Sequence, residues 1–257
     1  MIESLSLSFG EKDRFAEIPF SQGARGELRA GISLKAAGNM RPGLPESRRN
    51  REALFCALGL AARRVFACRQ VHSRKVLPIR ALEAGSHTLL EADGLVTDLQ
   101  QAVLTVTVAD CLPLFIRDKK TGAFGLLHSG WKGTGIATRA IDCMRSLYGS
   151  EPKNLEVIVG PGIGSCCYAV DEERYLRFRE LFGLESASSR GNRFFLDLRK
   201  ANLLLLQEMG VEDIRVVRDC TSCNPALASF RRDGPQACVH MLAVLGTFDP
   251  YTGAHHE

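Results

Sequence analysis

Short apolar runs recur through the middle of the chain at a length typical of strands. They are rich in Val, Ile, Thr and Phe, and they predict strands at residues 65–71, 102–116, 123–127, 155–159 and 214–217. Between some of them, apolar residues repeat at helical spacing up to a glycine, the usual helix stop. These patterns predict helices at residues 47–60, 134–148 and 197–209. The combination predicts a mixed α/β or α+β architecture.

Polar and small residues without periodicity fill residues 183–193, which predicts a surface loop. The stretch is too short to separate two domains. No repeat occurs at the periods of solenoids or propellers. We therefore expect residues 1–257 to form a single domain.

The composition is that of an ordinary globular protein, with 45% hydrophobic and 24% charged residues and a formal net charge of +4. The basic residues are scattered, so no nucleic-acid stripe is visible. No uncharged stretch reaches the roughly 18 residues of a spanning helix. Residues 1–10 include Glu3 and lead into four charged residues, unlike a signal peptide. We expect a cytoplasmic protein that binds neither nucleic acid nor membranes; its oligomeric state is left open.

The cysteines number nine, and an odd number favours reduced thiols over a complete disulfide framework. Cys220 and Cys223 have the spacing of redox or metal sites, but no second Cys-x-x-Cys accompanies them. We expect these two to pack or to support a nearby site. Four others sit among apolar residues and are expected to pack as small hydrophobes: Cys56, Cys68, Cys143 and Cys238.

Three predicted strands run into groups that are costly to bury without partners. The first leads into His72, the second passes Asp110 and Cys111, and the third leads into His128. If these ends converge, two imidazoles and a thiolate would suit zinc or copper and leave a fourth position open, as in catalytic zinc sites. The separations match no local zinc-finger spacing, so structural roles for these residues stay open on this evidence.

Two glycine-containing segments follow strands. HSGWKGTG at residues 128–135 leads into a helix, whose first backbone amides attract anions; a tight strand-to-helix turn is the alternative. GPGIG at residues 160–164 lacks the full spacing of a dinucleotide or phosphate loop. Neither segment alone identifies a ligand.

Several motifs occur in one order along roughly residues 60–245. They are QVHS (70–73), EADGLVT (91–97), ADCLP (109–113), HSGWKG (128–133), GPGIGSCCY (160–168), DLRKAN (197–202), and CT (220–221) followed by FRRDG (230–234). In this order the chain resembles the YfiH-like laccase-domain family, also called polyphenol oxidases and more recently purine nucleoside phosphorylases. The resemblance implies an α+β fold, an α/β/β/α sandwich of mixed sheets related to cysteine hydrolases of the cytotoxic necrotizing factor type.

The resemblance also implies that His72, Cys111 and His128 are metal ligands of a zinc-dependent purine nucleoside enzyme. Its reactions would be phosphorolysis of adenosine, inosine or methylthioadenosine and deamination of adenosine. In deamination, zinc-bound hydroxide would attack the purine and Asp110 would move protons. In phosphorolysis, Arg231, Lys132 or the amides after Gly130 are candidates to hold phosphate.

Other functions are compatible with the same residues. Copper-dependent polyphenol oxidation is one, but oxygen reduction needs several copper centres and the chain has only six histidines, of which His255 and His256 lie at its end. A peptidoglycan hydrolase would use Cys111 as nucleophile and His128 as base. A non-catalytic binding module is the last alternative.

The chain departs from the family pattern in places. Residues 23–26 (GARG) and 33–35 (SLK) stand where Thr-Arg-x-Gly-Gly and Ser-Leu-Asn are expected, and Ala169 replaces an acidic residue. These departures leave room for a divergent activity.

Overall fold

The computed structural model describes residues 2–21, 28–60, 64–81 and 90–251, which excludes the 23–26 segment, His255 and His256. The strands are β1 (Ile2–Leu5), β2 (Phe15–Glu17), β3 (Leu28–Ser33), β4 (Arg64–Phe66), β5 (Val76–Pro78), β6 (Gly94–Thr97), β7 (Ala102–Val108), β8 (Leu112–Asp118), β9 (Phe124–Ser129), β10 (Leu155–Val159), β11 (Ala169–Val170), β12 (Ala187–Arg190), β13 (Arg193–Leu196), β14 (Asp213–Val217) and β15 (Met241–Thr247). The α-helices are α1 (Pro45–Ala57), α2 (Ile136–Tyr148), α3 (Glu172–Phe182), α4 (Leu198–Glu208) and α5 (Phe230–Ala237), with short 3-10 turns η1 (Lys35–Ala37), η3 (Pro152–Asn154) and η4 (Leu184–Ser186).

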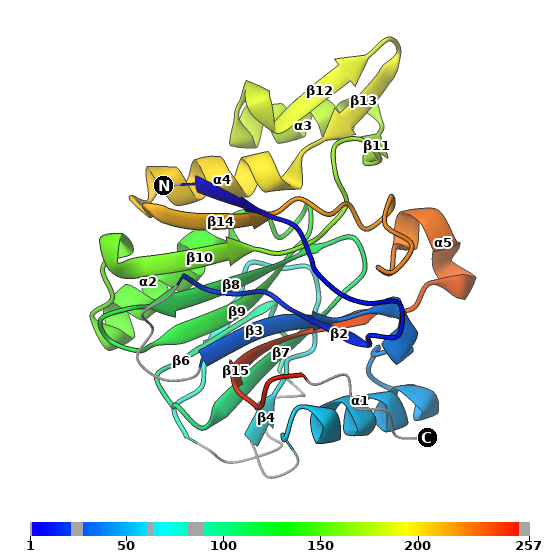
Figure 1. Cartoon of the computed structure of the whole chain (residues 1–257). Helices are drawn as coiled ribbons and strands as arrows, with labels where there is room; N and C mark the ends of the chain where they lie inside the picture. Colours follow the sequence, from blue (N-terminus) through cyan, green and yellow to red (C-terminus); the bar gives the residue numbers. More distant parts are fainter. Residues whose placement is uncertain (1, 22–27, 61–63, 82–89, 252–257) are drawn as a thin grey trace.

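The described strands form two larger sheets and one small one (Figure 1). The seven-stranded sheet has the order β1-β14-β10-β8-β9-β6-β5, and the five-stranded sheet has the order β2-β3-β15-β7-β4. Both combine parallel and antiparallel pairs: β14 runs parallel to β10, for example, while β8 is antiparallel to it. The three-stranded sheet, β11-β13-β12, is antiparallel. The predicted mixed α/β class is confirmed.

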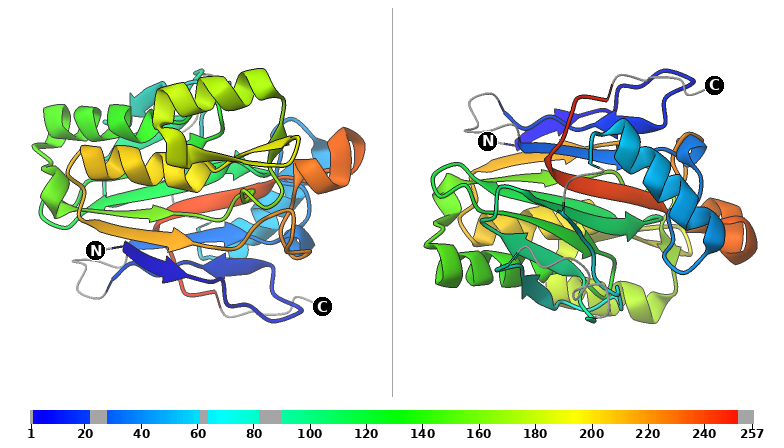
Figure 2. Two further views of the ribbon diagram at one scale, coloured as in Figure 1. Left: turned by 90° about the horizontal axis from the view of Figure 1, so that it is seen from above. Right: turned by 90° about the horizontal axis from the view of Figure 1, so that it is seen from below.

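The two large sheets pack face to face, and helices cover their outer faces (Figures 1 and 2). Strand β8 shows why: Leu114 and Ile116 pack against the helices α2, α3 and α4, whereas Phe115 points to the five-stranded sheet. On the far side, Leu54 and Leu58 of the α1 region pack against that sheet. Strands with apolar side chains on both faces, such as β8, thus form the centre of the molecule. The relation to cysteine hydrolases stays a prediction.

The predicted strand at 102–116 is two strands, β7 and β8, which belong to different sheets. Asp110 lies in the turn between them with φ of 80°, a conformation that Asp tolerates better than most residues. The predicted strand at 65–71 ends at Phe66. Beyond it, the Gln70 side chain bonds the backbone N–H and C=O of Thr107 in place of a strand ladder.

The predicted loop at 183–193 was wrong. It contains η4 and β12, which pairs with β13 across a turn at Gly191, where φ is 58°. Only Ala187 of β12 is buried, and the three residues after it are polar and exposed. The strand therefore lacks the alternation of apolar and polar residues by which strands are recognised in a sequence. Backbone pairing to β13, whose Phe195 and Leu196 are buried, holds the strand.

Among the described residues, no helix combines the length and the apolar character needed to cross a membrane.

Candidate metal centre

Three segments that are distant in sequence meet at one edge of the sheets. His72 lies in the loop after β4, Cys111 lies in the β7–β8 turn, and His128 lies on β9. The pairing of β8 with β9 sets Pro113 opposite His128, which brings Cys111 beside that histidine. One potential ligand atom from each of the three residues lies within 4.8 Å of the other two. The two imidazole rings are 4.9 Å apart, nearly perpendicular at 80°.

Asp93, at the start of β6, organises this site. Its buried carboxylate accepts hydrogen bonds from the backbone N–H groups of Val71, His72 and Ser73 at 3.3, 3.0 and 2.6 Å. It also accepts from Ser73 Oγ at 2.7 Å and lies 2.9 Å from His128 Nδ1. Burial opposes ionisation, but these hydrogen bonds outweigh it and lower the pKa of Asp93 to about 2.

The contact with Asp93 determines how His128 presents its ring. A carboxylate oxygen only accepts, so Nδ1 carries the proton, and Nε2 is the nitrogen left to face Cys111 or a metal. A carboxylate behind a ligating histidine is a recurrent feature of metal sites. Asp93 is part of the EADG motif, but no role was predicted for it; the signal that could have indicated one is an acidic residue directly before a buried strand.

Backbone strain accompanies this arrangement. His72 and Asp110 are the two non-glycine residues with positive φ in the described chain, at 59° and 80°. Such conformations cost on the order of 1–3 kcal/mol each and cluster at functional sites. The hydrogen bond from the His72 backbone N–H to Asp93 holds His72 in this conformation, and hydrogen bonds from Thr221 and Arg231 hold Asp110.

In the metal-free chain, Cys111 and His128 each favour the charged form of the other. Burial opposes the thiolate, but the charge of His128 and hydrogen bonds from both histidines lower the pKa of Cys111 to about 7. Burial likewise opposes the imidazolium, but Cys111 and Asp93 raise the pKa of His128 to about 9. A thiolate is the form of cysteine that binds metals and acts as a nucleophile.

Gly130 makes room for the sulfur. A Cβ at this position would lie 2.6 Å from Cys111 Sγ and 3.5 Å from the His72 ring. Any larger residue would therefore displace the thiol. The two imidazoles and the thiolate form a donor set that fits a transition-metal ion.

Asp110 connects the centre to α5. Its Oδ1 accepts from Thr221 Oγ1 at 2.6 Å, and its Oδ2 accepts from the backbone N–H of Arg231 at 2.7 Å. Ser229 caps the same helix by accepting from Arg232 N. Oδ2 thus holds the start of α5 and Oδ1 holds the loop after β14, while the role of Asp110 in proton transfer stays a prediction.

The exposed Arg231 side chain lies beside Tyr168. Its guanidinium is 5.4 Å from the centre of the Tyr168 ring and donates to Ala169 O at 2.8 Å. Burial and the charge of Cys111 raise the pKa of Tyr168 to about 12.

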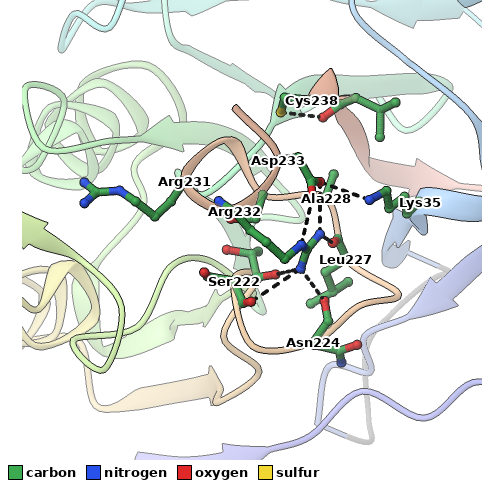
Figure 3. Close-up of polar contacts among 12 residues, drawn as sticks. Lys35, Ser222, Asn224, Leu227, Ala228, Arg231, Arg232, Asp233 and Cys238 are labelled. Carbon is green, nitrogen blue, oxygen red and sulfur yellow. Dashed lines mark hydrogen bonds and ion pairs between the residues drawn. The ribbon is translucent and has the colours of Figure 1, made fainter. Parts of the chain in front are cut away.

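The neighbouring Arg232 has a different role. Figure 3 shows the Arg231 side chain pointing away from the hydrogen-bond network that surrounds Arg232. That network consists of the carbonyls of Thr221, Ser222, Asn224 and Leu227 and the carboxylate of Asp233, which also pairs with Lys35.

Further cations flank Trp131, in the turn after β9. The exposed Lys132 lies with Nζ 5.7 Å from the Trp131 ring centre, and Arg174 of α3 stacks over the same ring at 4.7 Å. Arg174 and Tyr168 were not singled out from the sequence, because their neighbours come from distant segments.

Comparisons with known proteins agree on one family. The family model described as multi-copper polyphenol oxidoreductase laccase matches residues 45–246. The chain is 37% identical over 199 residues to a purine nucleoside phosphorylase of Deinococcus radiodurans, covering 77% of this chain and 76% of that one.

This chain belongs to the YfiH-like laccase-domain family.

Solved structures of laccase-domain proteins share its fold. The crystal structure of YlmD from Geobacillus stearothermophilus superposes with a TM-score of 0.80 at 30% identity, covering 90% of this chain and 99% of that one. The YfiH protein of Bacillus licheniformis superposes with a TM-score of 0.77 at 26% identity, covering 85% and 92%. The YlmD sequence, whose protein is named a purine nucleoside phosphorylase, is 31% identical over 217 residues, 79% of each chain.

The lowered pKa of Cys111 predicts that this laccase-domain protein, freed of any bound metal, is alkylated at Cys111 at a lower pH than an ordinary thiol requires. Because the thiolate is the reactive form, the rate of reaction with iodoacetamide should rise through about pH 7 and fall away below it. Burial raises the pKa of Cys238 to about 11, so that thiol should stay unmodified at pH 7.5. Peptide mass spectrometry across a pH series measures both. A midpoint for Cys111 near the ordinary thiol value of about 8.5 would contradict the charged pair.

Proposed function

We propose that this protein is a zinc-dependent purine nucleoside enzyme, which phosphorolyses adenosine, inosine or methylthioadenosine and deaminates adenosine. The observation that carries the proposal is the cluster of His72, Cys111 and His128. Trp131 follows Gly130, which adjoins Cys111 Sγ, and the backbone N–H of Arg231 donates to Asp110, the residue before Cys111. The relatives named purine nucleoside phosphorylases support the same substrate class. When bound at these three ligands, zinc supplies a Lewis acid with an open coordination position.

In phosphorolysis, an oxygen of phosphate bonds to the sugar carbon C1′ while the bond from C1′ to the purine nitrogen breaks. The products are the free purine, which takes up a proton, and ribose 1-phosphate, or 5-methylthioribose 1-phosphate from methylthioadenosine. Arg231 presents a planar fork for two phosphate oxygens, and Lys132 adds a second positive charge. A purine would stack on the ring of Trp131 or Tyr168 in place of the guanidinium group of Arg174 or Arg231, which lies over that ring in this structure.

Deamination replaces the amino group of adenosine, which leaves as ammonia, by an oxygen from water, and it needs a group that moves protons. We assign this role to Asp110, the carboxylate next to Cys111. Since Thr221 and the Arg231 backbone donate to its two oxygens, one of these hydrogen bonds must break during the transfer. Phosphate takes no part in this reaction, which separates it from phosphorolysis.

The decisive experiment is a substrate screen of the zinc-loaded protein. Adenosine, inosine and methylthioadenosine are incubated with and without phosphate, and bases and nucleosides are quantified by chromatography. We expect free base to form only with phosphate, and inosine to form from adenosine without it. Absence of both products from a metal-loaded, folded protein would refute the proposal.

Metal identity is tested on the same protein. Two histidines and one cysteine suit zinc, but they also occur in copper sites. Within the described residues, His72 and His128 are the only histidines in a potential ligand group, too few for the several copper centres of a laccase. We expect zinc in protein purified without added metal. Stoichiometric copper together with polyphenol oxidation would instead support an oxidoreductase.

One observation favours a second candidate function. Cys111, His128 and Asp93 form a chain in which a carboxylate orients an imidazole beside a thiolate, the arrangement of a cysteine hydrolase. In that case Cys111 would attack a carbonyl carbon directly, as a peptidoglycan-editing hydrolase requires. Chelation separates the two functions, because it abolishes a zinc-dependent activity and spares a cysteine nucleophile.

Arg231→Lys should weaken phosphorolysis through phosphate binding. Lysine keeps the charge but lacks the fork for two phosphate oxygens. We expect the apparent KM for phosphate to rise about tenfold, as the loss of roughly 1.4 kcal/mol of charge-assisted hydrogen bonding predicts. Metal content and deamination should stay near wild type.

Arg177→Lys, at an exposed position on α3, is the matched control. Initial rates of inosine cleavage across a phosphate series compare the variants. An unchanged phosphate KM in Arg231→Lys would remove Arg231 from the phosphate site.

A further inference from the structure

A second group of cysteines lies outside the site described above. Cys166 and Cys167 are in the loop before β11, and Cys220 and Cys223 are in the loop after β14. All four sulfur atoms lie within 4.8 Å of one another. Cys223 Sγ is 3.7 Å from Cys166 Sγ and 3.4 Å from Cys167 Sγ, although 56 residues separate Cys167 from Cys223. This group was not predicted from the sequence, because the partner of the Cys-x-x-Cys pair is an adjacent Cys-Cys pair and only the fold brings the two pairs together.

The spacing of the sulfurs fits a tetrahedral metal ion. Four thiolates bound to zinc at about 2.3 Å lie at the corners of a tetrahedron with edges of about 3.8 Å. The separations of Cys223 Sγ from Cys166 Sγ and Cys167 Sγ lie near this edge length, and all the others are within 4.8 Å. One disulfide would use two of the sulfurs, whereas one tetrahedral ion uses all four.

Both loops are shaped around the sulfurs. The N–H of Gly164 donates to Cys220 Sγ at 3.1 Å, and Cys223 N donates to Cys220 O at 3.1 Å to close the turn. A Cβ on Gly164 would lie 3.0 Å from Cys166 Sγ and 3.4 Å from Cys220 Cβ. The glycine therefore lets the loops approach, and its amide points at the sulfur as a supporting donor of a metal thiolate does.

A largely buried cation accompanies the group. Arg199 of α4 donates through Nη2 to the carbonyls of Gly162 and Asp219, at 2.6 and 2.5 Å. These carbonyls lie in the same two loops, and the guanidinium is close enough to Cys166 and Cys220 for their charges to act on it. A zinc ion with four thiolates carries a net charge of −2, which such a cation offsets in part.

We propose that Cys166, Cys167, Cys220 and Cys223 bind one zinc ion in a closed, structural site. All four coordination positions are taken by the protein, so this ion binds no substrate. It joins the loop after β10 to the loop after β14.

The proposed ion also supports the first site. Thr221, between two of the cysteines, donates to Asp110 Oδ1 and through its backbone N–H to Gly162 O. Asp110 adjoins Cys111. The ion would thus fix Thr221, which bonds the turn that positions Cys111. Because the four cysteines fill its coordination positions, the ion would do so without contacting substrate.

The test is the zinc content of the full chain, purified anaerobically with zinc and measured by atomic emission. We expect two zinc ions per wild-type chain and one in each of Cys223→Ser and Cys167→Ser. Cys56→Ser, which alters an exposed thiol outside the group, should keep two. The double variant His72→Ala/Cys111→Ala should keep one, held by the four cysteines, so the result does not depend on the proposed activity.

X-ray absorption at the zinc edge of that double variant identifies the ligands. We expect four sulfur neighbours at about 2.3 Å. Nitrogen or oxygen neighbours, a metal-free double variant, or a disulfide among the four cysteines of the anaerobic wild-type protein would overturn the proposal. If Cys223→Ser fails to fold, the double variant and the wild-type zinc count still decide it.

Discussion

Replacing Cys111 by alanine should abolish turnover while leaving the fold intact. The change removes one of three ligands at the proposed open metal position and the partner that keeps His128 charged. Changing even a group that merely supports a ligand costs metal sites about 10 to 100-fold in affinity or activity, so we expect a loss above 100-fold. Zinc content should fall by one ion per chain. Nucleoside cleavage rates and metal analysis measure both effects.

Cys143→Ala is the matched control, because Cys143 lies on α2, away from the metal centre. It should stay active and keep its zinc. The melting temperature of Cys111→Ala should change by less than about 4 °C, which corresponds to about 1 kcal/mol for a chain of this size. Equal loss of activity in both folded variants would show that the wrong cysteine has been assigned to the site.

Asp93→Asn should combine a loss of stability with a loss of metal. The amide keeps the shape of the side chain, but its NH2 group would face N–H donors from the backbone of 71–73 or the His128 ring. Breaking a buried charged pair costs about 3 to 5 kcal/mol of the free energy of unfolding. With His72 and His128 no longer oriented, zinc affinity should fall about 10 to 100-fold.

Asp98→Asn, at an exposed position just beyond β6, tests whether any loss of a negative charge in this segment has the same effect. Asp98→Asn should change neither the free energy of unfolding nor the zinc affinity. Denaturant unfolding and competition with a zinc chelator give the stability and the affinity. Wild-type zinc affinity in Asp93→Asn would mean that the carboxylate serves the loop at 71–73 alone.

The sequence alone was sufficient to predict those helices and strands whose own residues show a clear apolar pattern. Strand β10 coincides with the predicted 155–159, and α2 and α4 lie within their predicted ranges, because buried strands and amphipathic helices show their burial in local periodicity. Strand β12 escaped prediction because it is polar and is held by backbone pairing with β13. The break between β7 and β8 escaped because apolar residues continue on both sides of Asp110.

The chemistry divides in the same way. From motif order and residue type the sequence singled out His72, Cys111 and His128, since imidazole and thiolate groups after strands carry a recognisable chemical cost when buried. Only the tertiary structure brought Asp93 behind His128 and Tyr168 beside Arg231. The four-cysteine group likewise depends on two loops that meet in space. Sheet order and strand register decide such contacts, and pairing between residues far apart in the chain leaves no local pattern in the sequence.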